Sequence, residues 1–542
     1  MKVVIVGGVA GGMSAATRLR RLMESAEIVV LERGDHVSFA NCGLPYYVGG
    51  VIPKRESLLL QTPESLAARF RLDVRVRHEV IALDSENRTV TVRALDSGRE
   101  YVEPFDELVL STGAAPIVPP LPGVERALVV RDVADVDRLA AAAADAQSAV
   151  VVGAGFIGVE MAENLVRKGI STTVVGRGPQ VLAPLDVEMA APVAAEMRDN
   201  GIRLELGVEP VGIDAEAVTL SDRRVIPADL VVMAIGVRPE SALARDAGLA
   251  IGSGGGIVVD DRLRTSAPHI YAVGDVVEKL DAVTGQSMLV PLANAANRQG
   301  RLVADAITGL TVADPPARGT AIIGVFDVRA ARTGWSETRL QAAGRPFRVL
   351  HSHPLAHAGY YPGARAMSMK LLIDPETDAI LGAQAVGGEG VDKRIDVLAT
   401  AMAGGIPASR LMDLELAYAP QFGSAKDPVN MLGYMADNLR IGALRTVQWH
   451  EIDEVIAAGS HLVDVRSPEE FAAGSIPGAR NIPLDELRER VDEIPQGSVL
   501  VFCQVGQRGN SATRVLTQRG RQAVNLDGGY RTWRDAIAGQ SR

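Results

Sequence analysis

The chain has 542 residues, of which 47 % are hydrophobic, a formal net charge of -10 and two cysteines. This length exceeds what one hydrophobic core can hold, so we expect roughly three or four domains. The negative charge argues against nucleic acid or an anionic membrane surface as the main partner, because both reward an excess of Lys and Arg.

The cysteine count and the hydropathy pattern indicate where the chain works. Two cysteines far apart in the sequence exclude a disulfide framework and a structural zinc site, and they favour the reducing cytoplasm. No apolar run approaches the ~18 residues of a membrane span. We therefore expect a soluble, cytoplasmic protein without a membrane partner.

The first residues predict a nucleotide-binding strand, turn and helix. A β-branched run at 3–6 closes on Gly7 and Gly8, and a helical pattern follows at 10–23. Gly7 and Gly12 match the G-x-G-x-x-G fingerprint, with Val9 in the place of the middle glycine. A second apolar strand at 28–31 leads to Glu32, 20 residues beyond Gly12, where a carboxylate can bind a ribose hydroxyl.

A second nucleotide unit follows a strand at 149–152. It has the strict pattern Gly153, Gly155 and Gly158, then a helical stretch at 159–167. Two units imply two dinucleotides, most simply a flavin and a nicotinamide exchanging a hydride. The next strand ends in Gly176-Arg177, where an NAD-selective site normally has an acid. An Arg can pair with a 2′-phosphate, so this departure favours NADPH and leaves NADH or dual use open.

The first helix carries a basic face. Ser14, Arg18 and Arg21 recur at spacings of four and three, and Arg69 and Arg71 form a second basic cluster. A solvated charged face is the simpler interpretation. If the two clusters converge, they predict a pocket for a polyanionic ligand.

Two later segments complete a recognisable order of motifs. AIGVRP at 234–239 and IYAVGD at 270–275 each follow a strand pattern. With the two fingerprints, they make residues 1 to about 440 resemble the flavoprotein disulfide reductases that bind two dinucleotides. The resemblance implies an α/β fold with two Rossmann-like domains, an FAD domain split over 1–115 and 250–315 and an NAD(P)H domain at 116–249, and an α+β dimerisation domain at 316–440 that forms a homodimer.

The same resemblance implies the cofactor contacts, with Glu32 on the adenosine ribose of FAD and Asp275 near its ribitol chain. The expected cofactor-binding residues are Gly7, Val9, Ala10, Gly12, Glu32, Arg33, Asn41, Thr112, Gly113, Gly153, Gly155, Ile157, Gly158, Gly236, Gly274, Asp275 and Ala293.

Cys42 is the single cysteine of the stretch SFANCGLP at 38–45. A helix start after it could hold it as a thiolate. Relatives with a redox pair have a second cysteine five positions later, where this chain has Tyr47. No His-x-x-x-x-Glu acid-base pair follows either, since 417–422 reads AYAPQF. A lone cysteine facing a flavin can form a sulfenic acid or a mixed disulfide with an external thiol.

The sequence around Cys42 helps to choose between these. SFANCGLPYY resembles the coenzyme A disulfide reductase branch, whereas NADH peroxidases and oxidases have Ser-Cys-Gly there and a His near the first glycines. HAGYYPG at 357–363 and LAYAP at 416–420 resemble the same branch. The resemblance implies that Tyr418 and either Tyr360 or Tyr361 reach the partner subunit's Cys42 and protonate a leaving thiolate. Ordinary packed tyrosines are the alternative. The implied coenzyme A contacts are Ser14, Arg18, Arg21, Ser38, Asn41 and one of Arg69 or Arg71.

The last hundred residues predict a separate α/β domain. A buried strand at 499–502 delivers Cys503 into a loop at 504–508, and we expect a helix from Ser511. Such a geometry aims backbone N–H groups at the loop centre, where they stabilise a thiolate or persulfide; a buried structural cysteine is the alternative. With the closing DGGYRTW, residues 447–542 resemble a rhodanese domain. This implies Cys503 as sulfane-sulfur acceptor and Arg508 as an anion contact, with Asp464, Arg466 and Glu470 as structural partners.

Together these features predict an FAD enzyme that uses NADPH or NADH to reduce S–S bonds in coenzyme A persulfide, polysulfide or disulfide through Cys42. The rhodanese end would handle small sulfane-sulfur donors. No metal is expected. The alternatives are an NAD(P)H oxidase or peroxidase that uses a Cys42 sulfenic acid, and a redox-sensing sulfur carrier. Whether sulfur passes between Cys503 and Cys42 stays open.

Overall fold

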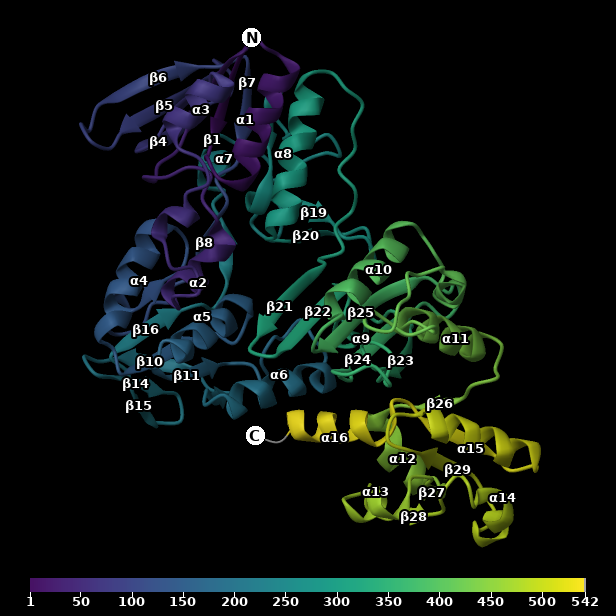
Figure 1. The fold of residues 1–542 in the computed structure, drawn as a ribbon. Helices are drawn as coiled ribbons and strands as arrows, with labels where there is room; N and C mark the ends of the chain where they lie inside the picture. Colours follow the sequence, from purple (N-terminus) through teal and green to yellow (C-terminus); the bar gives the residue numbers. More distant parts are fainter. Residues whose placement is uncertain (541–542) are drawn as a thin grey trace. The chain divides into compact units, whose positions relative to one another are not determined.

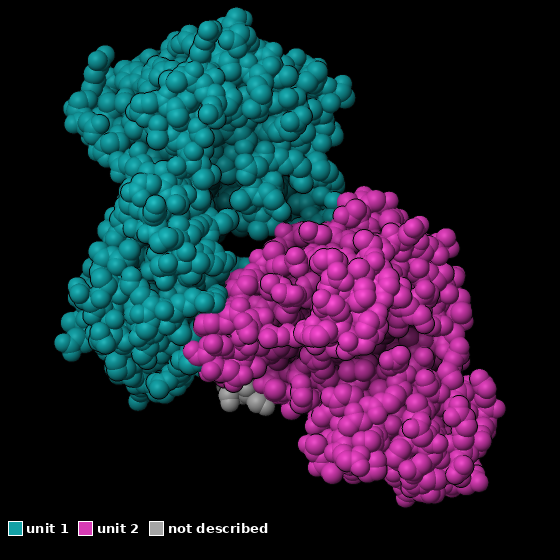
Figure 2. Space-filling view, viewed as in Figure 1, with its two compact units in different colours: residues 1–177, 201–319 teal, residues 178–200, 320–542 magenta. Residues whose placement is uncertain are grey.

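The computed structural model describes residues 1–540, which form two compact units (Figures 1 and 2). The first comprises Met1–Arg177 and Gly201–Gly319, and the second comprises Gly178–Asn200 and the chain from Thr320 onward. A short piece of the second nucleotide-binding region thus belongs to the second unit. Within residues 1–540, no helix combines the length and the apolar character needed to cross a bilayer.

The first unit contains a five-stranded parallel sheet that begins at the N-terminus. Its central strand is almost wholly apolar because both faces of the sheet are covered. Val3 and Ile5 pack in a core cluster with helix residues, whereas Val4 and Val6 pack in a cluster that includes an antiparallel meander. The strand order is β18 (Ile270–Ala272), β7 (Glu107–Leu110), β1 (Lys2–Val6), β2 (Glu27–Leu31) and β3 (Asp73–Arg75). The helices of this part are α1 (Ala10–Leu22), α2 (Leu44–Val48), α3 (Pro63–Phe70), α7 (Ala242–Asp246) and α8 (Ala293–Ile307).

Helices α1 and α8 pack along each other because a glycine lies where they approach most closely. A Cβ on Gly300 would lie 2.3 Å from the carbonyl oxygen of Gly11. Beside the sheet lie an antiparallel meander and a hairpin. Their strands are β4 (His78–Asp84), β5 (Thr89–Ala94), β6 (Glu100–Pro104), β19 (Glu278–Leu280) and β20 (Ser287–Leu289).

A second parallel sheet follows the second glycine fingerprint. Its strand order is β12 (Arg203–Leu206), β11 (Ser171–Gly176), β10 (Ser148–Val152), β16 (Leu230–Met233) and β9 (Leu128–Val129). Helices α4 (Val133–Asp145) and α5 (Phe156–Arg167) accompany it, as do the strands β13 (Pro210–Ile213), β14 (Ala217–Leu220) and β15 (Val225–Pro227). The antiparallel pair β8 (Ala114–Pro116) and β17 (Val237–Pro239) joins the two sheet regions.

The second unit is built around an antiparallel sheet. Its order is β21 (Ala321–Val325), β22 (Val328–Gly334), β25 (Ile380–Gly387), β24 (Ser368–Ile373) and β23 (Arg348–Ser352). Its helices are α6 (Val187–Asp199), which packs on β22 and β25, α9 (Glu337–Ala342), α10 (Val391–Ala403) and α11 (Pro428–Arg440).

The C-terminal domain adds a parallel sheet to the second unit. Its order is β26 (Thr446–Val447), β30 (Ala523–Leu526), β29 (Val499–Phe502), β27 (His461–Asp464) and β28 (Arg480–Asn481). Its helices are α12 (Ile452–Ala457), α13 (Pro468–Ala472), α14 (Leu487–Arg490), α15 (Gln507–Gln518) and α16 (Gly529–Gln540). The α/β fold class expected from the sequence, with its antiparallel third part and its C-terminal parallel domain, is confirmed.

Candidate active sites

A cavity of about 1230 Å³ opens at the carboxyl ends of β1 and β2 in the first unit. Most residues expected to contact FAD line it. They are Gly7, Val9, Ala10, Glu32, Arg33, Asn41, Thr112, Gly113, Gly274 and Asp275. Gly12, Gly236 and Ala293 are not among its lining residues.

The first glycine turn explains why Gly12 lies outside the cavity. Gly7 has φ +100, and a Cβ there would lie 2.2 Å from the carbonyl oxygen of Ser111. A Cβ on Gly12 would lie 1.9 Å from the carbonyl oxygen of Gly7. Gly12 therefore lets α1 pack against the turn, while Val9 precedes α1 and lines the cavity. The imperfect fingerprint still builds the expected turn.

The acidic groups of this cavity suit a ligand rich in hydroxyls. Glu32 accepts hydrogen bonds from the backbone N–H of Gly8 at 2.7 Å and of Gly34 at 2.8 Å. Asp275 Oδ1 is buried and has no hydrogen-bond partner in residues 1–540. Burial raises the pKa of Asp275, and the positive charge of Lys279 opposes that rise. A ribitol hydroxyl would satisfy the buried oxygen, so the donor set fits a flavin dinucleotide.

Two residues of the cavity, Arg131 and Glu240, were missed from the sequence, whereas Arg33 was expected there. Arg33 and Arg131 each donate to Glu240 Oε2 at 2.7 Å, and all three residues line the cavity. Because these residues come from separate segments of the chain, no local motif marks them. Their guanidinium groups provide positive charge in a cavity expected to hold a pyrophosphate.

The second glycine turn repeats the geometry of the first. Gly153 has φ +117, and a Cβ there would lie 2.2 Å from the carbonyl oxygen of Ala234; a Cβ on Gly158 would lie 1.9 Å from that of Gly153. Gly155 faces open space at the start of α5, where a ligand backbone can approach closely. Arg177, directly after β11, is exposed.

Cys42 lies just ahead of a helix start, where the sequence analysis expected it. It occupies a 3₁₀ turn, Asn41–Gly43, ahead of the five-residue helix α2, and its side chain is exposed. Partial desolvation raises the pKa of the Cys42 thiol, and the negative charges of Glu160 and Asp275 raise it further. For the chain alone the thiolate predicted from the helix start is therefore not favoured, because desolvation, together with the two carboxylates, outweighs the lowering effect of a backbone hydrogen bond.

The segment after Cys42 is fixed against the helices of the second nucleotide region. A Cβ on Gly49 would lie 2.2 Å from the side-chain oxygen of Asn164 on α5, so α2 and α5 approach closely. The Tyr46 hydroxyl lies 3.4 Å from Glu160 Oε1. Burial raises the pKa of Glu160 to about 7 and that of Tyr46 to about 12. Glu160 is thus a carboxylate near Cys42 that titrates close to neutral pH.

The residues expected to contact coenzyme A lie on or near α1, and several already have partners. Arg18 donates to Asp305 at 2.7 Å, and the Ser14 hydroxyl donates to Asn297 at 2.7 Å, both on α8. Arg71 pairs with Glu24 at 3.1 Å, where both side chains are exposed. Arg21 and Arg69 are exposed, and Ser38 has a positive φ of 49.

One buried side chain brings the two basic clusters together. Arg20 donates hydrogen bonds to the carbonyl oxygens of Phe70 at 2.7 Å and Arg71 at 2.9 Å. These bonds hold the end of α3 against α1, so the two segments that carry the basic residues lie side by side. Asn297, on α8, belongs to the same polar surface. It was not predicted because it lies far from Ser14 in the sequence.

The tyrosines predicted to act as acids lie together at the surface of the second unit. The hydroxyls of Tyr360 and Tyr418 are 2.8 Å apart, and the two side chains are 76 % and 48 % exposed. The hydrogen bond with Tyr360 raises the pKa of Tyr418. Tyr361 stacks edge-on against His357, with ring centroids 5.7 Å apart. Exposure of these phenols argues against the alternative of ordinary core packing.

Cys503 directly follows β29 and is fully buried, unlike Cys42. Helix α15 begins at Gln507 rather than at the expected Ser511, because Gly506, with φ +88, ends the loop early. Arg508 thus lies in the first helical turn and makes two hydrogen bonds of 2.7 Å to Glu470. Glu470, and more weakly the Cys503 sulfur, raise the pKa of Arg508.

The residues expected to be structural partners of this domain are paired. Arg466 and Asp464 are buried and joined by hydrogen bonds of 2.7–3.0 Å. The Arg466 guanidinium also lies 4.3 Å from the centroid of the Tyr530 ring. These contacts fix β27 and the start of α16 on either side of the Cys503 loop.

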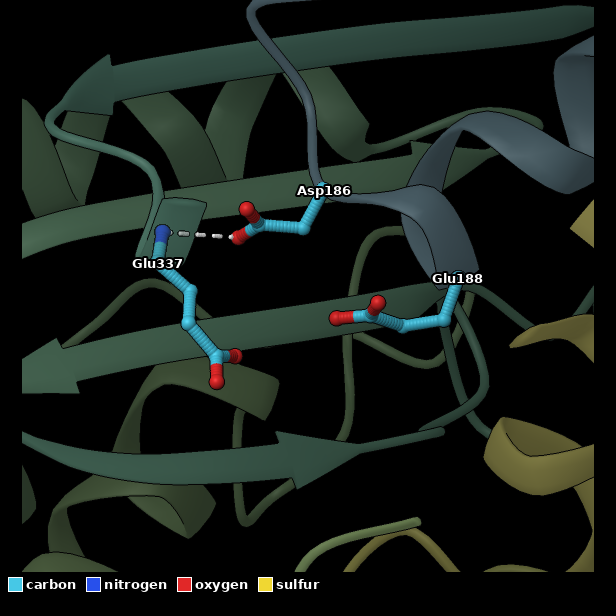
Figure 3. Close-up of side chains that lie close together, drawn as sticks. All are labelled: Asp186, Glu188 and Glu337. Carbon is cyan, nitrogen blue, oxygen red and sulfur yellow. Dashed lines mark hydrogen bonds between the residues drawn. The ribbon is translucent and has the colours of Figure 1, made fainter. Parts of the chain in front are cut away.

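The second unit also contains three buried carboxylates close together, Asp186, Glu188 and Glu337 (Figure 3). Such a trio could hold a metal ion, but the Lys370 ammonium lies 2.9, 2.5 and 2.6 Å from their oxygens. The lysine is therefore their counter-ion. The cluster ties the segment before α6 to the antiparallel sheet.

Family models match three successive parts of the chain. Residues 1–300 match "Pyridine nucleotide-disulphide oxidoreductase", residues 320–428 match the dimerisation domain of that family, and residues 449–536 match "Rhodanese-like domain". The chain therefore belongs to the pyridine nucleotide-disulphide oxidoreductase family and carries a C-terminal rhodanese domain.

Particular relatives narrow this placement. The chain is 34 % identical over 440 residues to coenzyme A disulfide reductase of Staphylococcus aureus, which covers 80 % of this chain and 99 % of that protein. It is 46 % identical to reduced Bacillus anthracis CoADR-RHD, with a TM-score of 0.98 over 99 % of this chain and 98 % of that one. It is 36 % identical to a NAD-dependent persulfide reductase from A. fulgidus, with a TM-score of 0.92 over 98 % and 100 %.

Proposed function

We propose that this chain is a homodimeric, cytoplasmic FAD enzyme that uses NADPH, or NADH, to reduce S–S bonds in coenzyme A persulfide, polysulfide or disulfide. The observation that carries the proposal is the single cysteine: Asn41, next to Cys42, lines the dinucleotide cavity, and Tyr47 stands where a second cysteine would be. The relatives named for coenzyme A disulfide and for persulfide support this substrate class.

The bound cofactors would supply two electrons, passed from the nicotinamide through the flavin. The chain's own part begins when the Cys42 thiolate attacks the coenzyme A sulfur of the S–S bond. A mixed disulfide of Cys42 and coenzyme A forms, and the other sulfur leaves as a thiolate or hydrosulfide. The two electrons then cleave the mixed disulfide, which restores the Cys42 thiolate and releases coenzyme A.

We propose that Tyr418 of the partner subunit, held by its bond to Tyr360, donates a proton to the leaving sulfur. A tyrosine hydroxyl is protonated at neutral pH, so Tyr418 has a proton to donate. The basic residues on α1 and at the end of α3 would together bind the phosphates of coenzyme A. In the rhodanese domain, Cys503 would accept sulfur from small sulfane-sulfur donors.

The test is mass spectrometry of the holoenzyme after exposure to coenzyme A disulfide. We expect one coenzyme A adduct on the Cys42 peptide that NADPH removes, and no change of this adduct in Cys503→Ser. A protein that turns over peroxide, leaves coenzyme A disulfide unreacted and accumulates a Cys42 sulfenic acid would instead be a peroxidase.

Cofactor preference has its own test. Because Arg177 follows β11 and is exposed, we propose that it pairs with the 2′-phosphate of NADPH. Arg177→Glu should lower the ratio of kcat/KM for NADPH over NADH by roughly tenfold, about the value of one such ion pair. Lys168→Glu, an exposed charge change at the end of α5, should leave the ratio unchanged.

A further inference from the structure

The rhodanese domain meets the dimerisation domain, within the second unit, at the edge strand β23. There Asp527 Oδ2 accepts hydrogen bonds from the backbone N–H of His351 at 2.8 Å and from its Nδ1 at 2.7 Å. The other ring nitrogen of His351 lies 3.0 Å from Glu188 Oε1. All three side chains are buried. Asp527 therefore accepts a backbone N–H on the open edge of β23 that would otherwise have no partner in the sheet.

This contact continues the charge cluster of Figure 3. Lys370 lies 2.5 Å from Glu188, so a row of alternating charges runs from Lys370 through Glu188 and His351 to Asp527. His353, directly after β23, adds a bond of 2.7 Å to the Thr532 hydroxyl on α16. Buried charges of this kind hold their partners in one geometry, because every alternative leaves a charge unpaired.

The residues that follow Asp527 lead directly to the Cys503 loop. A Cβ on Gly528 would lie 2.8 Å from His351 Cβ, and a Cβ on Gly529 would lie 2.3 Å from the carbonyl oxygen of Cys503. The backbone N–H of Tyr530 donates to that same oxygen at 2.8 Å. The short run 527–530 thus touches the dimerisation domain at one end and the Cys503 loop at the other.

We propose that His351 of the dimerisation domain is a positioning residue for sulfur transfer at Cys503, acting through Asp527 and the two glycines that support the loop. The proposal rests on the proposed sulfurtransferase role of Cys503. In this proposal, a residue of the dimerisation domain helps to position the Cys503 loop of the rhodanese domain.

The protonation of His351 gives this role a signature. Burial alone lowers the pKa of His351, but hydrogen bonds to Asp527 and Glu188 outweigh it and raise the pKa to about 9, against a smaller opposing effect of Lys370. The other charged groups of the row, Asp186 and Glu337, face Lys370. At neutral pH both ring nitrogens therefore donate. Above pH 9 one carboxylate loses its donor.

The test uses full-length holoenzyme and two activities: sulfur transfer from thiosulfate to cyanide, and reduction of coenzyme A disulfide. His351→Gln should lower kcat for sulfur transfer by roughly 10- to 100-fold, because small displacements of a reacting atom have effects of this size. Disulfide reduction should stay within about twofold, since it uses Cys42. Asp527→Asn should have a similar effect, and the double variant should add little to either single variant.

Gln448→Ala is the matched control, since it removes another side-chain bond to β23, at 3.4 Å from the carbonyl oxygen of Val349, away from residues 527–530. It should leave both activities unchanged. Wild-type sulfur transfer should decline above pH about 9, and this decline should be absent in His351→Gln. A structural role alone would not move the pH profile.

Three results would overturn the proposal: normal sulfur transfer in His351→Gln, additive effects of the two substitutions, or an unchanged pH profile. Should His351→Gln not fold, Asp527→Asn, which keeps the side-chain shape, replaces it. If wild-type protein transfers no sulfur from thiosulfate, or Cys503→Ser transfers it normally, the proposed role of Cys503 fails instead, and the two failures are told apart.

Discussion

The two cysteines lie in opposite surroundings. Cys42 is exposed in a short turn, and the charges of Glu160 and Asp275 oppose its ionisation. Cys503 is fully buried, on a loop that backbone bonds and Arg508 hold in place. Cys503 is thus held by contacts of its own domain, whereas few groups of the chain enclose Cys42. A ligand with positive groups, or one that displaces water, would change Cys42 most.

Substitution of each cysteine by serine should distinguish the roles of the two sites most clearly. Cys42→Ser should lower coenzyme A disulfide reduction by roughly 10³-fold or more, because the hydroxyl is a far weaker nucleophile. FAD content and sulfur transfer should be retained. Cys503→Ser should have the reverse pattern. Equal loss of both activities in either variant would mean that the sites are one catalytic unit.

Loss of the buried Lys370 ammonium should destabilise the second unit, which contains Cys503, and leave the first unit intact. Lys370→Met leaves Asp186, Glu188 and Glu337 without their cation, which should lower the free energy of unfolding by about 3–5 kcal/mol. Thermal unfolding followed by circular dichroism measures this, with FAD content as a readout of the first unit. Lys393→Met removes a partly exposed ion pair in which the Lys393 ammonium lies 3.5 Å from Asp427. This change should lower the free energy of unfolding by about 1 kcal/mol or less. Similar effects of both changes would contradict this account.

Alkaline pH should weaken the contacts of His351 with Asp527 and Glu188 and lower the stability of the protein. The folded-state pKa of His351 is raised from 6.5 to about 9, so its stabilisation is complete below the unfolded value and is lost as the pH rises through about 9. The loss should amount to about 3 kcal/mol. The midpoint of thermal unfolding between pH 7 and 10 measures it, and His351→Gln should remove this part of the pH dependence. An identical slope in the variant would argue against a charged His351.

The smallest expected effect concerns the charge beside Cys42. Glu160→Gln removes a negative charge, so the pKa of Cys42 should fall and its alkylation by iodoacetamide at pH 8 should become up to about tenfold faster. At pH 6 the two proteins should react at similar rates, because Glu160, with a pKa of about 7, is then largely neutral in the wild type. Tyr46→Phe, which keeps the carboxylate, is the control. An equal acceleration at both pH values would point to a steric cause.

Features whose cause is local could be predicted from the sequence. The turn at Gly7 and Gly12, the strict turn at Gly153 and the strand that delivers Cys503 all depend on neighbours within a few positions. The start of α15 was misplaced because the positive φ of Gly506 cannot be read from residue type alone.

Features that join distant segments could not be predicted. The Ser14–Asn297 and Arg18–Asp305 bonds connect positions almost 300 residues apart. The raised pKa of Cys42 could not be predicted, because its largest cause is desolvation by the folded chain and because Glu160 comes close only through the packing of α2 on α5. Side-chain contacts made by tertiary packing decide such electrostatics, and a single sequence carries no local trace of them.

Lys370 makes the junction of the second unit independent of dissolved ions. The three carboxylate groups around its ammonium would otherwise form an oxygen-rich site suited to Mg²⁺ or Ca²⁺. Because the cation is attached to β24, chelators cannot remove it, and a fall in divalent ion concentration leaves the junction intact. If alanine replaced Lys370, the three carboxylates would lose this attached cation, and only a dissolved cation could neutralise them.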